Sequence, residues 1–297
     1  MSFSSNAKEE ICRAAVNKRC CALAESYGVL LFCNTFSRTR VRIVTESTPF
    51  AQRIPKLFKK AFGIEPDSIT GGEGSKYTIE IRERSSIARI FDAIGYGEER
   101  DVALHLNLGV VEEECCRAAF LRGAFLSGGS ATSPEKNYHL ELLTSHYYVS
   151  REAFALLLDM GFEPKASKRK SNYVIYFKSS EQIENFLTKA GAPVAAMTIM
   201  SAKVEKELNN RVNRRINCDA ANADRTVDAA QEQLEAIAAL RRAGILETLP
   251  EKLQETARLR EMYPELSLNQ LCEMFQPQVS KSCLNHRLRK LSELARK

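Results

Sequence analysis

The residues with the clearest chemical potential in this chain are its nine cysteines, because thiolates bind soft metals and take part in disulfide exchange. Four of them form two adjacent pairs, Cys20-Cys21 and Cys115-Cys116. Structural zinc sites usually draw on Cys-x-x-Cys pairs, but this chain has none, and only four histidines are available as further ligands. The sequence therefore predicts no metal site and no cofactor. It predicts cysteines that act as buried free thiols in a reducing compartment.

Basic side chains near the end of the sequence indicate a different chemistry, the binding of phosphates. Residues 277–297 contain six Lys or Arg and one Glu, a local charge of +5 in a chain whose formal net charge is +6. Such an excess suits a polyanionic partner such as double-stranded DNA. It also suits a solvated basic helix whose charge complements its own dipole, so the arrangement of the residues has to decide between the two.

Three short helices are expected to carry these basic residues. The first enters at Pro250, and the second begins at a capping box formed by Ser267 and Gln270. Ser280 caps the third helix. The apolar stripe of the third helix is Leu284, Leu288, Leu291 and Ala295. This pattern predicts a helix-turn-helix domain over residues 250–297, whose last helix lies in the major groove of DNA.

The face opposite that apolar stripe predicts which side chains reach DNA, because positions two apart on a helix lie on roughly opposite faces. Asn285 can pair with adenine and Arg289 with guanine, whereas Arg287 and Lys290 lie to the sides, nearer to phosphates. The residues predicted to contact DNA are Ser280, Lys281, Ser282, Asn285, His286, Arg287, Arg289 and Lys290.

An internal repeat organises the first two thirds of the chain. The cysteine pairs recur at an offset of 95, and each pair is followed by six residues and then a glycine, Gly28 or Gly123. Further matches continue downstream. Each copy predicts a first helix, an apolar strand, a helix closed by a glycine, an alternating strand and a last helix. The repeat therefore predicts an α+β fold built from two equivalent units.

Small residues line one face of the first helix in each copy. Ala119, Gly123 and Ser127 recur every four positions, and Ala24 and Gly28 correspond to the first two of them. This spacing predicts that the two helices pack closely across a pseudo-twofold axis.

The second of these helices carries a recognisable motif. The run Leu121-Arg-Gly-Ala-Phe-Leu-Ser-Gly-Gly129 is similar to the LAGLIDADG motif of homing endonucleases. Together with Asn213-Arg-Arg-Ile-Asn-Cys-Asp-Ala-Ala-Asn222 and Asn285-His-Arg-Leu-Arg-Lys290, it resembles the WhiA family of bacterial proteins over essentially the whole chain. The resemblance implies a degenerate two-repeat LAGLIDADG homing-endonuclease-like domain followed by an all-α helix-turn-helix domain. It also implies a role in cell division, chromosome organisation or sporulation.

The two positions where a LAGLIDADG nuclease has its metal-binding acids are occupied by Cys33 and Gly128. Neither side chain supplies the hard oxygen ligand that Mg²⁺ requires. Glu25 lies two turns earlier on its helix, and Glu112, Glu113 and Glu114 precede the other. We therefore expect no catalytic residues, and an active endonuclease is the least favoured alternative.

Further basic residues on or near the strands are candidates for secondary DNA contacts. Arg40 and Arg42 share one face of a strand by their spacing, as a pair lining a groove would. The secondary candidates are Arg40, Arg42, Lys168, Arg169, Lys170 and Arg214. A solvated sheet face and a charged loop explain the strand residues equally well, and the block Asn213–Asn222 has no role that the sequence defines.

These features divide the chain into residues 1–97 and 98–198, two LAGLIDADG-like repeats, then 199–249, a helical linker, and 250–297, a DNA-binding domain. The composition is that of a globular protein, with no apolar run long enough to cross a membrane and no signal-peptide core. We predict a cytoplasmic, nucleoid-associated, non-enzymatic DNA-binding regulator. A protein-interaction scaffold with weak DNA binding, contacting transcription or cell-division proteins, remains the main alternative.

Overall fold

The structure, a computed structural model, describes residues 2–72, 74–97 and 103–296. By its internal contacts the chain divides into two compact units, Met1–Lys206 and Glu207–Lys297. This division falls inside the segment that the sequence predicts as a linker. The predicted boundary between the two repeats, after residue 97, adjoins residues 98–102, which lie outside the described residues.

The first repeat is an antiparallel four-stranded sheet with helices. Its strands have the order β1-β2-β4-β3. The two central strands, β2 and β4, pair with each other from Val41 opposite Ile81 to Thr45 opposite Tyr77. The elements are α1 (Phe3–Arg13), α2 (Arg19–Leu31), β1 (Thr35–Phe36), β2 (Val41–Thr45), α3 (Thr48–Phe62), β3 (Ser68–Thr70), β4 (Tyr77–Ile81) and α4 (Arg84–Ala93).

The second repeat has the same topology, with strand order β5-β6-β8-β7. Its central strands pair Leu140 with Phe177 through Thr144 with Tyr173. The elements are the 3₁₀ turn η1 (Leu108–Val111), α5 (Glu114–Gly128), β5 (Gly129–Ala131), β6 (Leu140–Thr144), α6 (Tyr147–Asp159), β7 (Lys165–Arg169), β8 (Asn172–Phe177) and α7 (Ser180–Ala190). Identical strand orders in the two repeats confirm the doubled α+β fold.

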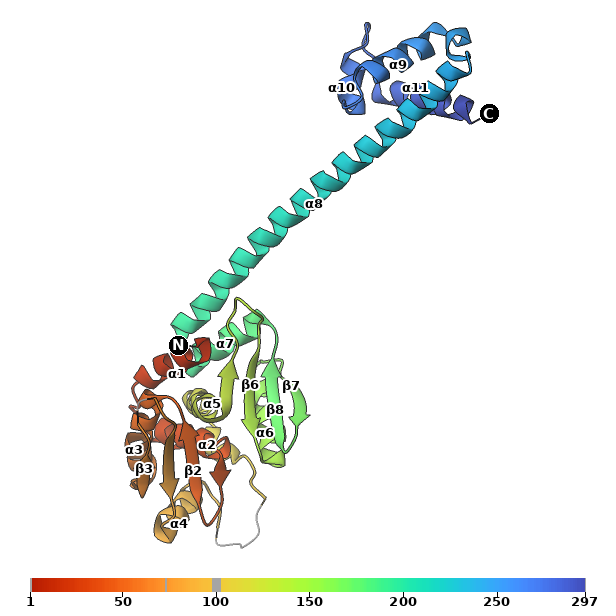
Figure 1. The fold of residues 1–297 in the computed structure, drawn as a ribbon. Helices are drawn as coiled ribbons and strands as arrows, with labels where there is room; N and C mark the ends of the chain where they lie inside the picture. Colours follow the sequence, from red (N-terminus) through yellow and green to blue (C-terminus); the bar gives the residue numbers. More distant parts are fainter. Residues whose placement is uncertain (1, 73, 98–102, 297) are drawn as a thin grey trace. The chain divides into compact units, whose positions relative to one another are not determined.

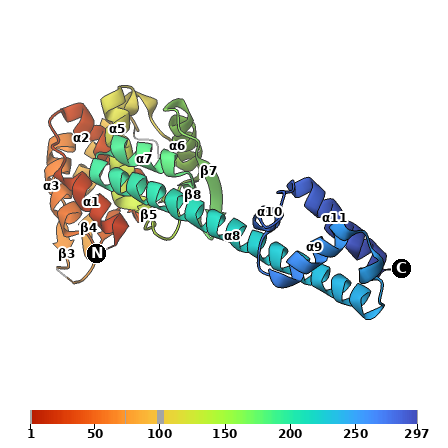
Figure 2. The same cartoon turned by 90° about the horizontal axis from the view of Figure 1, so that it is seen from above.

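Helices α2 and α5 lie side by side at the centre of this unit, with α3 packed on the first sheet and α6 on the second (Figures 1 and 2). Both helices are apolar on most of their surface, because each is covered by its partner helix as well as by a sheet. One continuous hydrophobic core therefore runs through both repeats.

The contact between α2 and α5 depends on Gly28 and Gly123, as the spacing of small residues predicts. A Cβ atom on Gly28 would clash with the Phe120 carbonyl oxygen and lie 2.8 Å from the Ala124 nitrogen. A Cβ atom on Gly123 would clash with the Glu25 carbonyl oxygen and lie 2.9 Å from the Val29 nitrogen. Each glycine meets the equivalent backbone of the other repeat, which is the signature of a pseudo-twofold axis.

The second unit has a separate core. Ile237 and Leu240, near the end of helix α8 (Pro193–Arg242), pack with the helices that follow it. These are the 3₁₀ turn η2 (Leu246–Thr248), α9 (Glu251–Met262), α10 (Leu268–Glu273) and α11 (Lys281–Ala295), and Figure 2 shows the last three gathered together.

Several local predictions are confirmed. Gly63 and Gly161 have φ angles of 69° and 82°. This left-handed conformation ends a helix, and glycine adopts it at a lower energetic cost than other residues. Ser267 and Gln270 form the expected capping box, and the Ser280 hydroxyl accepts a hydrogen bond from the Cys283 amide at 3.2 Å.

Other local predictions are wrong. Pro250 is the N-cap of α9 rather than its first helical residue, and α8 begins at Pro193 rather than near residue 199. Helix α1 and the edge strands β1, β3, β5 and β7 were not predicted. These edge strands are short or polar, so no clear apolar alternation marks them.

The prediction that the cysteines are buried is also wrong for six of the nine, because only Cys33, Cys116 and Cys272 are buried and Cys12 and Cys21 are half-buried. Cys20, Cys115, Cys218 and Cys283 are exposed, and all nine are free thiols. Each exposed cysteine lies on a helix and is accessible to solvent.

Candidate nucleic-acid interface

Helix α11 presents a polar face to solvent and an apolar face to the core of its unit. Leu284, Leu288 and Leu291 are buried. The exposed residues of the predicted set are Ser280, Lys281, Ser282, Asn285, His286, Arg289 and Lys290, whereas Arg287 is half-buried. The structure thus brings the predicted contact residues together on one helix and its cap, with most of their polar groups accessible.

Two arginines of α11 already have partners within the protein. The Arg289 Nε atom donates a hydrogen bond to Glu293 at 2.9 Å, one helical turn away, and both side chains are more than half exposed. The Arg287 guanidinium lies over the Phe275 ring at 5.6 Å. Arg289 is therefore held only by a weak surface pair that a base or phosphate can replace. Arg287 also covers the hydrophobic core, a role that the sequence did not indicate.

A buried arginine ties together the helices beneath α11. Arg260 of α9 is 1% exposed; its Nε atom donates to the Gln233 side chain at 2.9 Å and its Nη1 atom to the Leu266 carbonyl at 2.6 Å. Burial lowers its pKa from the ordinary value. Because the partners come from α8 and from the turn before α10, Arg260 holds the scaffold that supports α11. The sequence does not indicate this role of Arg260, because the spacing of the residue on α9 matches no motif.

On the first sheet, three arginines surround one carboxylate. Arg42 lies directly opposite Glu80 in the strand register, and Arg40 and Arg82 pair with the same carboxylate. The hydrogen bond from Arg40, followed by that from Arg82, holds the Glu80 pKa below its ordinary value. The group keeps a charge of about +2 on the face of the sheet turned away from the core, which supports a role for Arg40 and Arg42 in phosphate binding without requiring it.

On the second sheet, the basic candidates separate onto different faces. Arg169 pairs with Glu141 at 3.3 Å, on the outer face. Lys168 is one residue earlier on the strand and lies over the Tyr173 ring at 5.4 Å, on the opposite face. Lys170 occupies the hairpin turn with a φ angle of 55°. Arg214, on α8, is exposed. Lys168 and Arg169 therefore cannot act on the same surface of the sheet.

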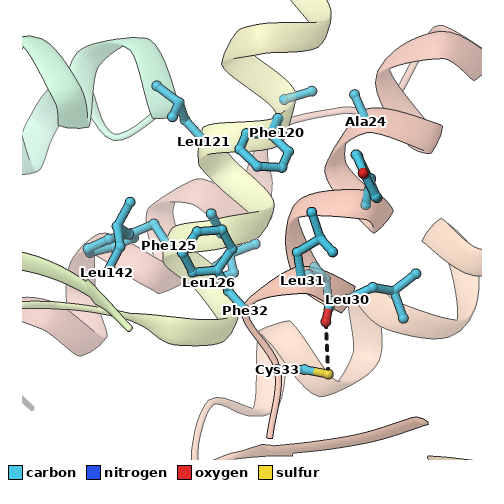
Figure 3. Close-up of a cluster of buried hydrophobic side chains, with 14 of the residues drawn as sticks. Ala24, Leu30, Leu31, Phe32, Cys33, Phe120, Leu121, Phe125, Leu126 and Leu142 are labelled. Carbon is cyan, nitrogen blue, oxygen red and sulfur yellow. Dashed lines mark hydrogen bonds between the residues drawn. The ribbon is translucent and has the colours of Figure 1, made fainter. Parts of the chain in front are cut away.

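The expected acid positions at the ends of the two motif helices are occupied by Cys33 and Gly128, neither of which has a carboxylate, and Figure 3 shows Cys33 hydrogen-bonded to Leu30. The Cys33 thiol donates hydrogen bonds to the carbonyls of Leu30 and Thr35, both at 3.2 Å, and burial raises its pKa to about 12. Gly128 has no room for a side chain, because a Cβ atom would meet the Leu143 and Phe32 carbonyls. Among the described residues that line the pocket at this end, none is acidic.

The nearest buried acid belongs to a structural ion network. Glu25 is fully buried and accepts hydrogen bonds from Arg53 at 2.6 and 3.0 Å and from Arg122 at 3.2 Å. Arg53 also donates to the carbonyls of Cys12 and Ala14. Both oxygens of this carboxylate accept from guanidinium groups, so its charge is compensated within the protein.

The four cysteines of the two adjacent pairs are the residues best able to hold a metal. The sulfur atoms of Cys20, Cys21, Cys115 and Cys116 all lie within 4.8 Å of one another. Spacing along the chain does not reveal this group, because the two pairs are 95 positions apart and the repeat brings them together in space.

No helix among residues 2–72, 74–97 and 103–296 combines the length and the apolar character needed to cross a membrane.

Comparisons with known proteins agree with this architecture. The family model described as the WhiA LAGLIDADG-like domain matches residues 117–209, and that of the WhiA C-terminal HTH domain matches residues 212–295. The chain is 38% identical to a probable cell division protein WhiA of Ruminiclostridium cellulolyticum, covering 99% of this chain and 97% of that protein. It is 38% identical to one from Desulfitobacterium hafniense, covering 100% and 96%.

Among solved structures, full-length DUF199/WhiA from Thermatoga maritima matches with a TM-score of 0.62 and 24% identity, covering 100% of this chain and 98% of that one. The N-terminal LAGLIDADG domain of DUF199/WhiA matches with a TM-score of 0.51 and 22% identity, covering 64% and 92%. These likenesses establish the fold.

Proposed function

Because the chain belongs to the WhiA family, we propose that it is a non-enzymatic DNA-binding regulator that acts in bacterial cell division. It binds double-stranded DNA through α11 and works in the cytoplasm on the nucleoid, as a transcription factor or a nucleoid-associated protein. Relatives named as probable cell division proteins support the process, and the helix-turn-helix domain supports the DNA partner. The resemblance to the WhiA family adds sporulation to the processes it controls.

The observation that carries this proposal is the division of α11 into two faces. Its leucines fill the core, whereas Asn285, His286 and Arg289 project their polar groups into solvent. In a helix-turn-helix, the residues of the last helix read base edges in the major groove. Lys281 and Lys290 add the positive charge that phosphates attract, and Ser280 and Ser282 offer hydroxyls at the helix N-terminus.

We propose that the protein does not cleave phosphodiester bonds, for a chemical reason. A LAGLIDADG-type centre needs two oxygen ligands for a divalent metal over the scissile phosphates. Cys33 is a neutral buried thiol here and Gly128 has no side chain. We propose that the repeat domain retains the nuclease architecture as a platform, with Arg40, Arg42 and Arg169 as secondary phosphate contacts.

The proposal is tested by removing the base-reading side chains of α11. Bacterial genomic fragments retained by the wild-type protein are sequenced, and one enriched duplex is used for fluorescence anisotropy over a series of salt concentrations. We expect the double variant His286→Ala, Arg289→Ala to weaken binding to that duplex by about tenfold or more, since one bidentate base contact contributes about 1–3 kcal/mol.

The matched control is Arg258→Ala, which removes an exposed arginine from α9 and leaves α11 intact. It should bind the duplex as the wild type does. Equal affinity and equal salt dependence in the double variant and the wild type would refute DNA reading by α11 and favour the protein scaffold. Metal-dependent cleavage that co-purifies with the wild type but not with Cys33→Ala would refute the non-enzymatic assignment.

A further inference from the structure

Four thiols converge where the two motif helices begin. Cys20 and Cys21 are the second and third residues of α2, and Cys115 and Cys116 are the second and third residues of α5. All four sulfur atoms lie within 4.8 Å of one another, and the Cys21 thiol donates to the Cys115 carbonyl at 3.7 Å. Among the described residues, this is the one group of three or more thiols, imidazoles or carboxylates close enough to share an ion.

The convergence follows from the repeat and from the glycines. Equivalent positions of the two repeats lie at equal heights along the helix pair, because Gly28 and Gly123 each meet the backbone of the other helix. A cysteine pair that starts one helix therefore lies beside the pair that starts the other. Each pair supplies only two thiol ligands, but the two pairs together supply the four ligands that a tetrahedral site needs.

The geometry suits a tetrathiolate zinc site. Zn–S bonds of about 2.3 Å place the four sulfur atoms of a tetrahedral site about 3.8 Å apart. The observed separations exceed this by about 1 Å at most, a shift that thiol side chains can make by small rotations about χ1. Cys116 is buried, Cys21 is half-buried, and Cys20 and Cys115 are exposed, so an ion can enter from solvent without opening the core.

The helix dipoles at this place favour thiolates. Two helix N-termini meet here, and neither N-cap residue, Lys18 or Glu113, supplies a side-chain hydrogen bond to the first turn. The free amide groups and the positive ends of two helix dipoles stabilise negative sulfur.

We propose that Cys20, Cys21, Cys115 and Cys116 form a Zn²⁺ site that links the first turns of α2 and α5. Binding replaces thiol protons with the metal and releases those protons to solvent, with no electron transfer. The ion joins the two repeats at the helix ends opposite those occupied by Cys33 and Gly128. The site is therefore structural, and it serves the platform that the repeat domain provides.

The test uses the full-length protein, purified with a reductant, stripped with a chelator and titrated anaerobically with Zn²⁺ in competition with a chromophoric chelator. We expect one Zn²⁺ bound per chain and a melting temperature several degrees higher than that of the stripped protein. Co²⁺ as a substitute ion should give the intense absorption of tetrahedral thiolate coordination.

The variant Cys20→Ser, Cys115→Ser changes the two exposed ligands, one in each repeat, and should weaken Zn²⁺ binding at least about 100-fold. Its control is Cys218→Ser, Cys283→Ser, which removes two exposed thiols outside the cluster and should bind Zn²⁺ as the wild type does. Circular dichroism of the stripped proteins shows whether each variant has folded.

Three results would overturn the proposal. The first is a wild-type protein that binds no Zn²⁺ while all four thiols react with a thiol reagent. The second is equal zinc affinity in the ligand variant and the wild type. The third is a wild-type protein isolated from cells with a disulfide between the two pairs, or with iron and sulfide in place of zinc.

Discussion

Helices α5 and α11 have the same length, fifteen residues each, but the protein uses them in opposite ways. Helix α5 buries eight residues on almost every side, and it approaches α2 so closely that Gly123 has no space for a methyl group. Helix α11 buries three leucines and leaves most of its polar residues in solvent. One helix is committed to packing, and the other has a free face for a partner.

This difference separates the LAGLIDADG-like motif of α5 from the face of α11 that we propose contacts DNA. The end of α5 has Gly128 where the motif has an acid, and Gly123 of the motif lets the two helices pack. The residues that we propose as DNA contacts on α11 are exposed, except for the half-buried Arg287, so packing does not fix their identity. Substitutions should therefore damage stability in α5 and binding in α11, and the following predictions test that division.

The largest effect is expected for Gly123→Val. The new side chain overlaps the Glu25 carbonyl oxygen, and backbone on both helices would have to move. We expect a loss of about 5 kcal/mol or more in the free energy of unfolding, seen by urea denaturation, because overpacking here acts on backbone rather than on flexible side chains. Gly72→Val is the control, since nothing lies within 4 Å of its Cβ position. A wild-type urea midpoint for Gly123→Val would refute the close helix contact.

The next largest effect is expected for Glu25→Gln, which leaves Arg53 and Arg122 facing each other without their shared carboxylate. Removing one partner from a buried ion network typically costs about 3–5 kcal/mol. The comparison is Glu293→Gln on α11, whose pair with Arg289 is exposed and should contribute about 0.5 kcal/mol or less. Equal losses in thermal denaturation of the two variants would contradict the contrast between the helices.

A smaller and mixed effect is expected for Arg287→Ala. Its stacking over Phe275 contributes about 0.5–1 kcal/mol to stability, and loss of its charge should reduce the slope of log affinity against log salt by about one unit. Lys290→Ala is the matched variant, because Lys290 is exposed and should change the salt slope without changing stability. If both variants unfold at the same urea concentration, Arg287 has no packing role.

The smallest effect is expected for Lys170→Gly in the turn between β7 and β8. Lys170 has a φ angle of 55°, a conformation that costs a side-chain-bearing residue about 1 kcal/mol more than glycine. After the extra entropy of glycine in the unfolded chain is subtracted, we expect a gain of about 0.5 kcal/mol by urea denaturation. Lys165→Gly, within the edge strand β7, should lower stability instead. Destabilisation by Lys170→Gly would show that the lysine side chain itself matters.

Local structure was predictable wherever neighbouring residues determine it. The Ser267–Gln270 capping box, the Ser280 cap and the leucine stripe of α11 all depend on side chains within one or two turns, so the pattern in the sequence is sufficient. The repeat was predictable because it is a comparison of the chain with itself. The short edge strands were not, because pairing with a neighbouring strand, rather than their own composition, makes them strands.

The candidate site was predictable only in part. The exposed set on α11 follows from helix periodicity, and the loss of acid at Cys33 and Gly128 follows from alignment of the two motif copies. Which face of the sheet Arg169 and Lys168 occupy depends on the strand register, which their own positions in the sequence do not reveal. The packing role of Arg287 depends on Phe275, a residue that precedes α11.

The sequence by itself therefore determined the repeat, the family, the last three helices of the C-terminal unit and the residues at the motif's two acid positions, Cys33 and Gly128. Only the tertiary structure decided which charges are neutralised by partners and which cysteines meet. Glu25 and Arg122 are 97 positions apart, and Cys20 and Cys116 are nearly as far. The physical reason is that ion pairs and shared ligands depend on distance in space, which the close packing of α2 on α5 sets and no local pattern encodes.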